Sequence, residues 1–278
     1  MSWMTEYRKR LKTAAEAVMA VESGQKVYMG SGCAAPHTLI DALTARAEEL
    51  QDVEIVHHLT LGEAPYIAGD MKGHFRLNDC FVGANTREAV NEGRADYVPV
   101  HLHEMPRLFR RGVIPLDCAF VVVSPPDEHG FCSFGIEVGV TKPAALAAGL
   151  IVAEVNRKMP RTLGDSFIHV SKIHSFVEVD NDLDEFRPPP STEVERKIGA
   201  NVAGLIEDGA CLQLGLGSIP NAVLDYLGDR RDLGVHTEMF TEALPDLVAA
   251  GVVTGEKKSF HPGKVVAGFI MGTRTVYD

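Results

Sequence analysis

A glycine-rich stretch is the first segment whose residue types could take part in chemistry. It reads Gln213-Leu214-Gly215-Leu216-Gly217-Ser218-Ile219-Pro220. Glycines let a backbone approach a ligand closely, and the N–H groups at the start of a following helix can hold an anion or an oxyanion. Pro220 stands where the dinucleotide-binding fingerprint needs its third glycine, and the lysine of a P-loop is missing. The stretch predicts a ligand-facing loop, with an ordinary strand-to-helix turn as the alternative.

A glutamate placed just after a predicted strand is the second candidate. Glu238 follows the short strand 234–236 within the run His236-Thr237-Glu238. Ligands of open α/β sheets bind beyond the carboxyl ends of the strands, so a carboxylate here is well placed for catalysis. It could serve as a base, a nucleophile or an ion-pair partner. The simplest alternative is a solvated surface glutamate.

Two further loops carry charged side chains. Asp127, Glu128 and His129 follow an apolar run, but three adjacent residues cannot all reach one ion, so we predict no metal site. The run 156–162 contributes cations that could meet a phosphate, or that could simply form a solvated basic loop.

Short apolar runs alternate with helical patterns, and these elements must position the loops. Residues 5–22 predict a helix, 26–29 a strand, 37–49 a helix and 53–56 a strand. A β–loop–α–β order is the unit of a parallel sheet. The run 118–124 is apolar at nearly every position, as expected for a strand buried on both faces. We therefore predict an α/β fold built on an open parallel sheet.

A proline run marks a domain boundary. Arg187-Pro188-Pro189-Pro190 forms a stiff, extended spacer that neither a helix nor a central strand can absorb. We predict an N-terminal domain over 1–190 and a C-terminal domain over 191–278. The helix–strand–loop–helix order of residues 5–49 recurs over 192–227, which predicts two tandem domains of one architecture. We expect the C-terminal domain to be truncated, because the chain stops soon after a predicted core strand.

Composition excludes several classes of protein. The formal net charge of −11 argues against a nucleic-acid partner. No stretch approaches the ~20 apolar residues that a membrane-spanning helix needs. The cysteines are scattered without CxxC spacing, which indicates reduced, buried thiols and a cytoplasmic location. They are Cys33, Cys80, Cys118, Cys132 and Cys211.

Four stretches in a fixed order resemble the acetyl-CoA hydrolase/transferase family, a group of class I CoA-transferases. They are VSPPDEHGFCSFG (123–135), EVNRKMPRTLG (154–164), QLGLGSIP (213–220) and GVHTEM (234–239). The resemblance covers essentially all of the chain, and four ordered motifs are a specific signal.

The resemblance implies two CoA-transferase-type domains with the active site between them. Glu238 matches the catalytic glutamate, and the loop Gly215-Leu216-Gly217 matches the one that lines the thioester site and helps form the oxyanion hole. The neighbouring residues are expected to contact substrate or CoA; they are Gln213, Ser218, Ile219, Pro220 and His236. A later glycine-rich motif of the family, GGxxDF, is not found in the chain, which raises the expectation of a fragment or of a second polypeptide that completes it.

The implied reaction moves coenzyme A between short carboxylic acids, for example acetyl-CoA and 4-hydroxybutyrate, through a glutamyl-CoA thioester. The expected partners are acyl-CoA, short carboxylic acids and a second copy in a homodimer, with no separate metal or redox cofactor. One alternative is acetyl-CoA hydrolysis at the same site. Another is a non-catalytic fragment that binds CoA or a partner chain. A third is a sugar-phosphate isomerase-like enzyme that uses Glu238 as a base and forms no covalent CoA adduct.

Overall fold

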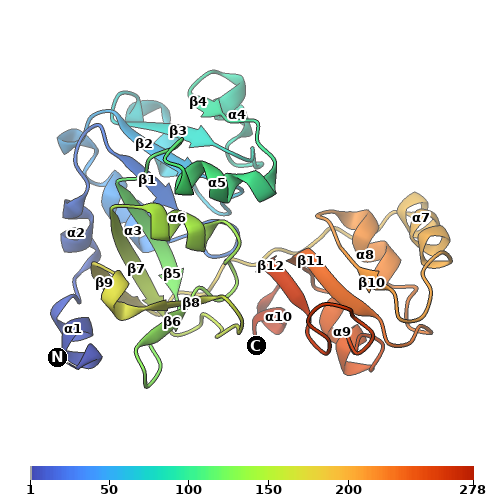
Figure 1. Ribbon diagram of the computed structural model, residues 1–278. Helices are drawn as coiled ribbons and strands as arrows, with labels where there is room; N and C mark the ends of the chain where they lie inside the picture. The colour runs from blue at the N-terminus through green and yellow to red at the C-terminus, as the bar shows by residue number, and fades with distance from the viewer. Residues whose placement is uncertain (1) are drawn as a thin grey trace. The chain divides into compact units, whose positions relative to one another are not determined.

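Seven parallel strands form the sheet of the first of two structural units, in the spatial order β4-β3-β2-β1-β5-β7-β9. The computed structural model describes residues 2–278 and divides into unit 1, which ends at Asp184, and unit 2, Glu185–Asp278 (Figure 1). The strands are β1 Lys26–Met29, β2 Val53–His57, β3 Phe75–Asp79, β4 Ala95–Tyr97, β5 Cys118–Val123, β7 Leu150–Asn156 and β9 Ser175–Val179. The predicted α/β fold with a large parallel sheet is confirmed.

Helices cover both faces of this sheet, as a parallel sheet requires. Alternate strand residues separate the two cores: Val27 and Met29 pack in the cluster that contains α3, and Tyr28 packs in the cluster that contains α5 and α6. β5 is buried at every position, which explains its unbroken apolar sequence. The helices of unit 1 are α1 Trp3–Lys9, α2 Ala14–Ala17, α3 His37–Thr44, α4 Arg87–Asn91, α5 Met105–Arg110 and α6 Thr141–Ala147.

The helix predicted over 5–22 is wrong as a single element. α1 and α2 are separated because the chain between them pairs with β9: Lys12 N donates to Phe176 O (2.9 Å) and Phe176 N donates to Arg10 O (3.0 Å). Thr13 then starts α2 with a capping box, in which its hydroxyl accepts from Glu16 N and its own N–H donates to the Glu16 carboxylate. A long-range strand contact therefore overrides the local helical pattern.

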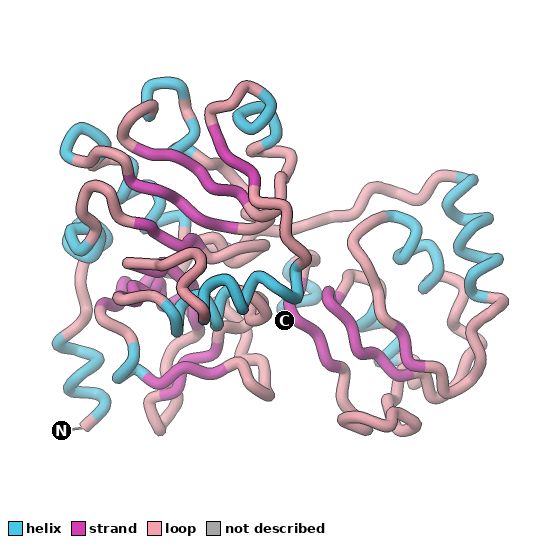
Figure 2. The backbone as a smooth tube through the Cα atoms, turned by 45° about the horizontal axis from the view of Figure 1, so that its top comes forward, coloured by secondary structure: helices cyan, strands magenta, loops and turns pink. Residues whose placement is uncertain are grey.

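A small antiparallel ladder, β6 Phe131–Ser133 with β8 Phe167–His169, joins the loops that leave β5 and β7. The sequence did not predict this ladder, since both strands are only three residues long. Figure 2 shows the strands of both units as magenta segments between cyan helices.

Unit 2 contains a three-stranded parallel sheet in the order β10-β11-β12. Its strands are β10 Cys211–Leu212, β11 Gly234–Phe240 and β12 Val266–Ile270, and its helices are α7 Glu193–Ala203, α8 Ser218–Leu224, α9 Leu244–Ala249 and α10 Arg274–Tyr277. α7 and α8 pack closely at Gly199, where a Cβ atom would lie 2.6 Å from Ala222 O.

Three details of unit 2 and of the cysteines correct or extend the sequence predictions. β11 continues to Phe240 instead of ending at His236, so Glu238 lies within a strand. Cys211 is exposed, whereas the other four cysteines are buried as predicted. Between residues 2 and 278, no helix combines the length and the apolar content that crossing a bilayer requires.

Candidate active site

The alternation of β11 determines which of its side chains reach solvent. Val235, Thr237 and Met239 are buried, while His236 and Glu238 are exposed on the opposite side of the strand. This is the period of two that a strand imposes on its side chains. The Glu238 carboxylate therefore points away from the core of unit 2, and no residue in 2–278 forms a hydrogen bond or ion pair with it.

A glycine stands beside Glu238 on the neighbouring strand β12. Thr237 pairs with Ala267 and Met239 with Phe269, so Gly268 lies opposite Glu238. Because glycine has no side chain, Gly268 does not cover the carboxylate. On the other side, the ladder between β10 and β11 ends at the pair Leu212–Val235, and the chain then enters the glycine loop.

The glycine loop is held to β11 by one buried hydroxyl. Thr237 Oγ1 accepts a hydrogen bond from Leu214 N (2.8 Å) and lies 2.9 Å from Leu214 O, to which it donates. The β10–β11 ladder ends at Leu212, so this contact between a side chain and the backbone ties the start of the loop to β11. The structure thus brings together the loop and the glutamate that the sequence singled out. Sequence reasoning missed Thr237, whose only signal is its position beside Glu238.

Gly217 has a backbone conformation that suits only glycine. Its φ of 139° and ψ of 174° lie in a region that side chains exclude, and it forms the N-cap of α8. Gly215 differs, because its φ is ordinary and a Cβ atom there would have no neighbour within 4 Å. The turn therefore needs Gly217 for its shape, whereas Gly215 borders open space.

The other predicted site residues have varied surroundings. The Ser218 hydroxyl donates to Glu195, whose carboxylate also accepts from Thr192 N (2.6 Å) at the start of α7. The hydrogen bond from Ser218 is the largest of the contributions that lower the pKa of Glu195. Ser218 thus links α8 to α7 rather than standing free for a ligand.

Gln213 and His236 also make contacts within unit 2. The Gln213 amide donates to Leu214 O (3.1 Å), and the His236 ring stacks on Phe260 with ring centroids 5.9 Å apart. Leu216 and Ile219 are exposed and Pro220 is partly buried in the first turn of α8.

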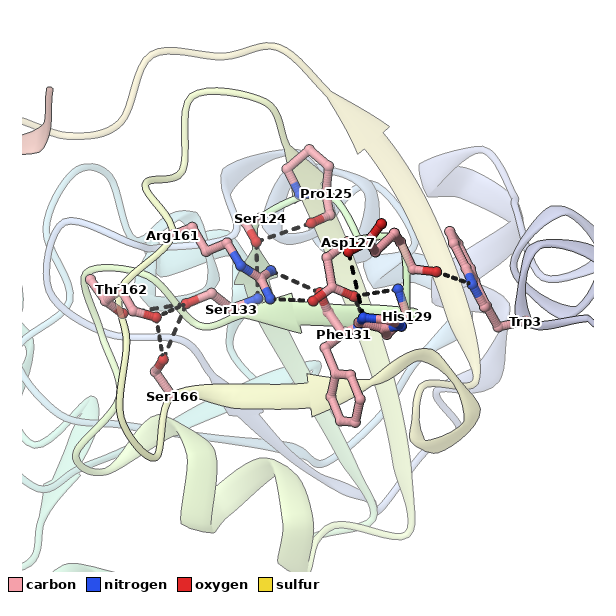
Figure 3. Close-up of polar contacts among 11 residues, drawn as sticks. Trp3, Ser124, Pro125, Asp127, His129, Phe131, Ser133, Arg161, Thr162 and Ser166 are labelled. Carbon is pink, nitrogen blue, oxygen red and sulfur yellow. Dashed lines mark hydrogen bonds and ion pairs between the residues drawn. The ribbon is translucent and has the colours of Figure 1, made fainter.

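Two of the sequence motifs form one hydrogen-bonded network in unit 1 (Figure 3). Asp127 accepts from His129 N (2.9 Å) and Phe131 N (2.8 Å), which shapes the loop after β5. Arg161, from the loop after β7, pairs with the Asp127 carboxylate, donates to Phe131 O (2.9 Å) and lies over the ring of Phe167. The Arg161 guanidinium thus joins the two motifs.

Two of the cations in the run 156–162 are paired with carboxylates. Besides the Arg161–Asp127 pair, Lys158 Nζ donates to Asp182 Oδ1 at 2.9 Å. Among the described residues, no group of three or more His, Cys, Asp and Glu side chains could hold a metal ion. The contacts in this part of unit 1 fit a structural role better than a phosphate site.

A second carboxyl group lies at the carboxyl edge of the sheet of unit 1 and was not singled out by the sequence. Glu154, in β7, is buried and accepts from Leu39 N (2.8 Å) at the start of α3. Burial raises the pKa of Glu154 to about 7, although hydrogen bonds from the backbone of Leu39 and Thr38 oppose the shift. Beside it, a cavity of about 20 Å³ is also lined by His37, which pairs with Asp184 at 2.7 Å. The only sequence signal was a glutamate inside an apolar strand.

Comparison with known proteins identifies the family of this chain. Residues 1–185 match the family model for the acetyl-CoA hydrolase/transferase N-terminal domain. The chain is 48% identical over 278 residues to 4-hydroxybutyrate coenzyme A transferase of Clostridium kluyveri, covering the whole chain and 65% of that relative. It is 45% identical over 261 residues to succinyl-CoA:acetate/propanoyl-CoA:succinate CoA transferase of Fasciola hepatica, covering 93% of the chain and 54% of that relative.

A solved structure agrees with these matches. The crystal structure of 4-hydroxybutyrate CoA-transferase from Porphyromonas gingivalis superposes on the whole chain with a TM-score of 0.88 and 40% sequence identity, and the chain covers 66% of it. The chain thus spans 54–65% of the length of the two curated relatives named above. On the family match and these identities, the chain belongs to the acetyl-CoA hydrolase/transferase family.

Proposed function

We propose that this protein is a CoA-transferase that moves coenzyme A between short-chain carboxylic acids, with Glu238 as its covalent nucleophile. The observation that carries the proposal is the placement of Glu238: its carboxylate is exposed, lies beside Gly268, and follows Thr237, whose hydroxyl holds the start of the glycine loop. The names of two relatives support 4-hydroxybutyrate as one acid, and the name of the matching family supports acetyl-CoA as the donor.

The proposed reaction proceeds by covalent exchange. The Glu238 carboxylate attacks the thioester carbonyl, the C–S bond breaks, and an acyl-glutamyl anhydride and CoA thiolate result. The thiolate then attacks the glutamyl carbonyl, which releases the first acid as a carboxylate and leaves a glutamyl-CoA thioester. A second carboxylate runs these steps in reverse and departs as its CoA ester. Splitting one exchange into several acyl transfers lowers each barrier.

The glycine loop would stabilise the charge that develops in each step. A carboxylate is a weak nucleophile, so the tetrahedral oxyanion needs N–H donors already in place; losing one such donor typically costs about 10²–10³ in rate. The backbone of Gly215–Gly217 is the candidate source of these donors. The steps are acyl transfers without a change of oxidation state, so they call for no redox cofactor. Backbone N–H donors can stabilise the oxyanion without a metal ion.

Hydrolysis is the competing outcome at the same site. Both the anhydride and the glutamyl thioester react with water, and the Glu238 side chain is exposed in unit 2. Acetate and free CoA released without an acceptor acid would measure this leak directly.

We further propose that unit 2 is the first part of a second CoA-transferase-type domain, as the predicted domains 1–190 and 191–278 require. The order β12-β11-β10 repeats the order β3-β2-β1 of unit 1. In addition, α7 exposes apolar side chains at helical spacing, Val194, Ile198 and Val202, and the exposed Leu205 follows the end of the helix. In unit 1 the apolar residues that precede β1, such as Val18 and Val21, are buried in the core cluster that also holds residues of β5, β7 and β9. A homodimer and a cytoplasmic location stay predictions, the first of which light scattering would test.

The decisive experiment is mass spectrometry of the peptide that contains Glu238. The natural gene product is incubated with acetyl-CoA and quenched rapidly, and we expect an adduct with the mass of CoA on Glu238. Glu238→Gln should abolish both the adduct and transfer to 4-hydroxybutyrate, while the fold is retained because the side chain is exposed.

Glu256→Gln is the matched control, because Glu256 is another exposed glutamate of unit 2. It should leave transfer and the adduct unchanged. Near-normal transfer by the Glu238→Gln enzyme would contradict the proposal, and transfer without an adduct would favour a non-covalent mechanism. Proton exchange on a sugar phosphate, with no adduct, would favour the isomerase alternative.

A further inference from the structure

We infer that Thr237 is the positioning residue that fixes the glycine loop relative to Glu238. The inference rests on the proposed function, since it gives Thr237 a part in the chemistry assigned to its neighbour. The role is one of positioning, because Thr237 acts through the loop that it holds. Its side chain is buried on the core side of β11, opposite to the side from which Glu238 projects.

The side-chain hydroxyl of Thr237 makes every contact on which the inference rests. Thr237 Oγ1 accepts from Leu214 N at 2.8 Å and lies 2.9 Å from Leu214 O and 3.2 Å from Met239 O. A hydroxyl has a single proton, so it donates mainly to Leu214 O, the nearer carbonyl, and only secondarily to Met239 O. Leu214 directly precedes Gly215 and Met239 directly follows Glu238. The hydroxyl therefore touches both the start of the loop and the strand on either side of the carboxylate.

The hydroxyl replaces backbone pairing that is missing at this point. The β10–β11 ladder ends at the pair Leu212–Val235, and Leu214 has left the strand. Leu214 O has a second donor, because the Gln213 amide reaches it at 3.1 Å. Among the described residues, Leu214 N has only the Thr237 hydroxyl. Leu214 is also buried, so water cannot take over that bond.

Loss of this bond should move the loop rather than unfold unit 2. A buried N–H without a partner is unfavourable, and the backbone can recover part of that cost by shifting toward another acceptor. Such a shift displaces Gly215 and Gly217 from Glu238, and a misplacement of ~1 Å in an active site can cost about 10² in rate. The structure therefore assigns Thr237 an effect on the chemical step.

The test compares Thr237→Val, which keeps the shape and removes the hydroxyl, with Thr237→Ser, which keeps the hydroxyl. We expect Thr237→Val to lower kcat about 10²-fold while KM for acetyl-CoA changes less than about threefold. The rate of adduct formation on Glu238 should fall by the same factor as kcat. Thr237→Ser should restore kcat to within about fivefold of the original enzyme.

Thr241→Val is the matched control. Thr241 is buried in the same unit, but its hydroxyl has no hydrogen-bond partner among the described residues, so its removal breaks no bond. This variant should keep kcat. If Thr237→Val melts below the assay temperature, Thr237→Ser and Thr237→Ala take its place, and only the serine enzyme should keep kcat.

The outcomes separate this inference from the proposed function. If the original enzyme forms the adduct and Thr237→Val forms it equally fast, the positioning role is wrong and the nucleophile assignment stands. If Thr237→Val and Thr241→Val lose kcat equally, the effect is general packing and the inference is again overturned. If the original enzyme forms no adduct on Glu238, the proposed function itself fails.

Discussion

Glu137, in the loop before α6, is a fully buried carboxyl group whose protonation affects the stability of unit 1. Burial raises its pKa to about 8, although hydrogen bonds from Val140 and Thr141 oppose the shift. In the unfolded chain its pKa is near the ordinary value of 4.5. Stability from this group is therefore fully present below pH 4.5 and is lost as the pH rises toward 8.

We expect Glu137→Gln to reduce the loss of stability as the pH rises from 4.5 toward 8, because glutamine stays neutral at every pH. The gain in Tm of the variant over the original protein should be larger at pH 8 than at pH 5, by about 2–4 °C for each kcal/mol recovered. Some slope should persist, since burial also raises the pKa of Glu154 to about 7. Thermal melting with the exposed Glu128→Gln as control tests this, and an equal Tm difference at both pH values would refute it.

The glycine loop gives the prediction at the scale of one element. Gly217→Ala forces a side chain into a backbone region that costs about 1–3 kcal/mol, or else shifts the loop. We expect transfer to fall at least about tenfold while Tm falls by only a few degrees, because the loop is exposed. Gly215→Ala should leave Tm unchanged, since nothing lies within 4 Å of its new methyl group. Parallel losses of Tm and activity in Gly217→Ala would mean that the loop is only structural.

The strands β1, β2 and β5 near the centre of the parallel sheet could be predicted from the sequence, because buried strands have mostly apolar sequences. The strands predicted over 26–29 and 118–124 lie within one residue of β1 and β5. The break between α1 and α2 could not be predicted, since its cause is Phe176, far away in the sequence. Short edge pairs such as β6 and β8 are likewise set by contacts that no local pattern contains.

The candidate site was predictable in outline and not in detail. The glycine loop and Glu238 carry recognisable motifs, and the hydroxyl of Thr237 joins the start of the loop to the strand that carries Glu238. Which polar groups are already occupied depends on three-dimensional neighbours. The Ser218 hydroxyl is bound by Glu195, and Arg161 is bound by Asp127, although the sequence alone leaves both residues available.

On the scale of the whole molecule, the chain leaves unit 1 through a segment that is fixed to α3. Asn181 Nδ2 donates to Thr38 Oγ1 (2.9 Å), and His37 pairs with Asp184 (2.7 Å). The hydrogen bond to Asp184, more than the nearby charges of Glu154 and Asp41, raises the pKa of His37. This contact is therefore fully present below the ordinary histidine pKa and weakens as the pH rises through the raised value.

Hydrogen exchange of residues 180–184 should report this weakening. After correction for the intrinsic rate, we expect exchange to increase as the pH rises from 6 to 9, and Asp184→Asn to remove most of that dependence. The buried strand β1 serves as the internal control, because its exchange should follow global stability alone. Unchanged pH dependence in Asp184→Asn would show that the His37–Asp184 pair does not hold the segment.

The two units have similar glycine-containing loops with different surroundings. Gly30-Ser31-Gly32 follows β1 as Gly215-Leu216-Gly217 follows β10, and the β1–β2 register places His58 opposite Gly30. His58 is buried, and burial lowers its pKa to about 4, so the ring is neutral near pH 7. In unit 2, the exposed Glu238 follows Thr237, whose hydroxyl holds the start of the glycine loop. One backbone arrangement thus supports a closed core in unit 1 and an open carboxylate in unit 2.

The alternation along β11 has a consequence for how this gene can change. Whether the Glu238 carboxylate faces solvent depends on an odd or even count of residues along the strand. A one-residue insertion between Val235 and Glu238 would turn the carboxylate into the core. A two-residue insertion would return it to the outer side, displaced by ~7 Å along the strand. Substitutions in this segment leave that count intact, whereas even the smallest length change alters the direction or the place of the Glu238 carboxylate.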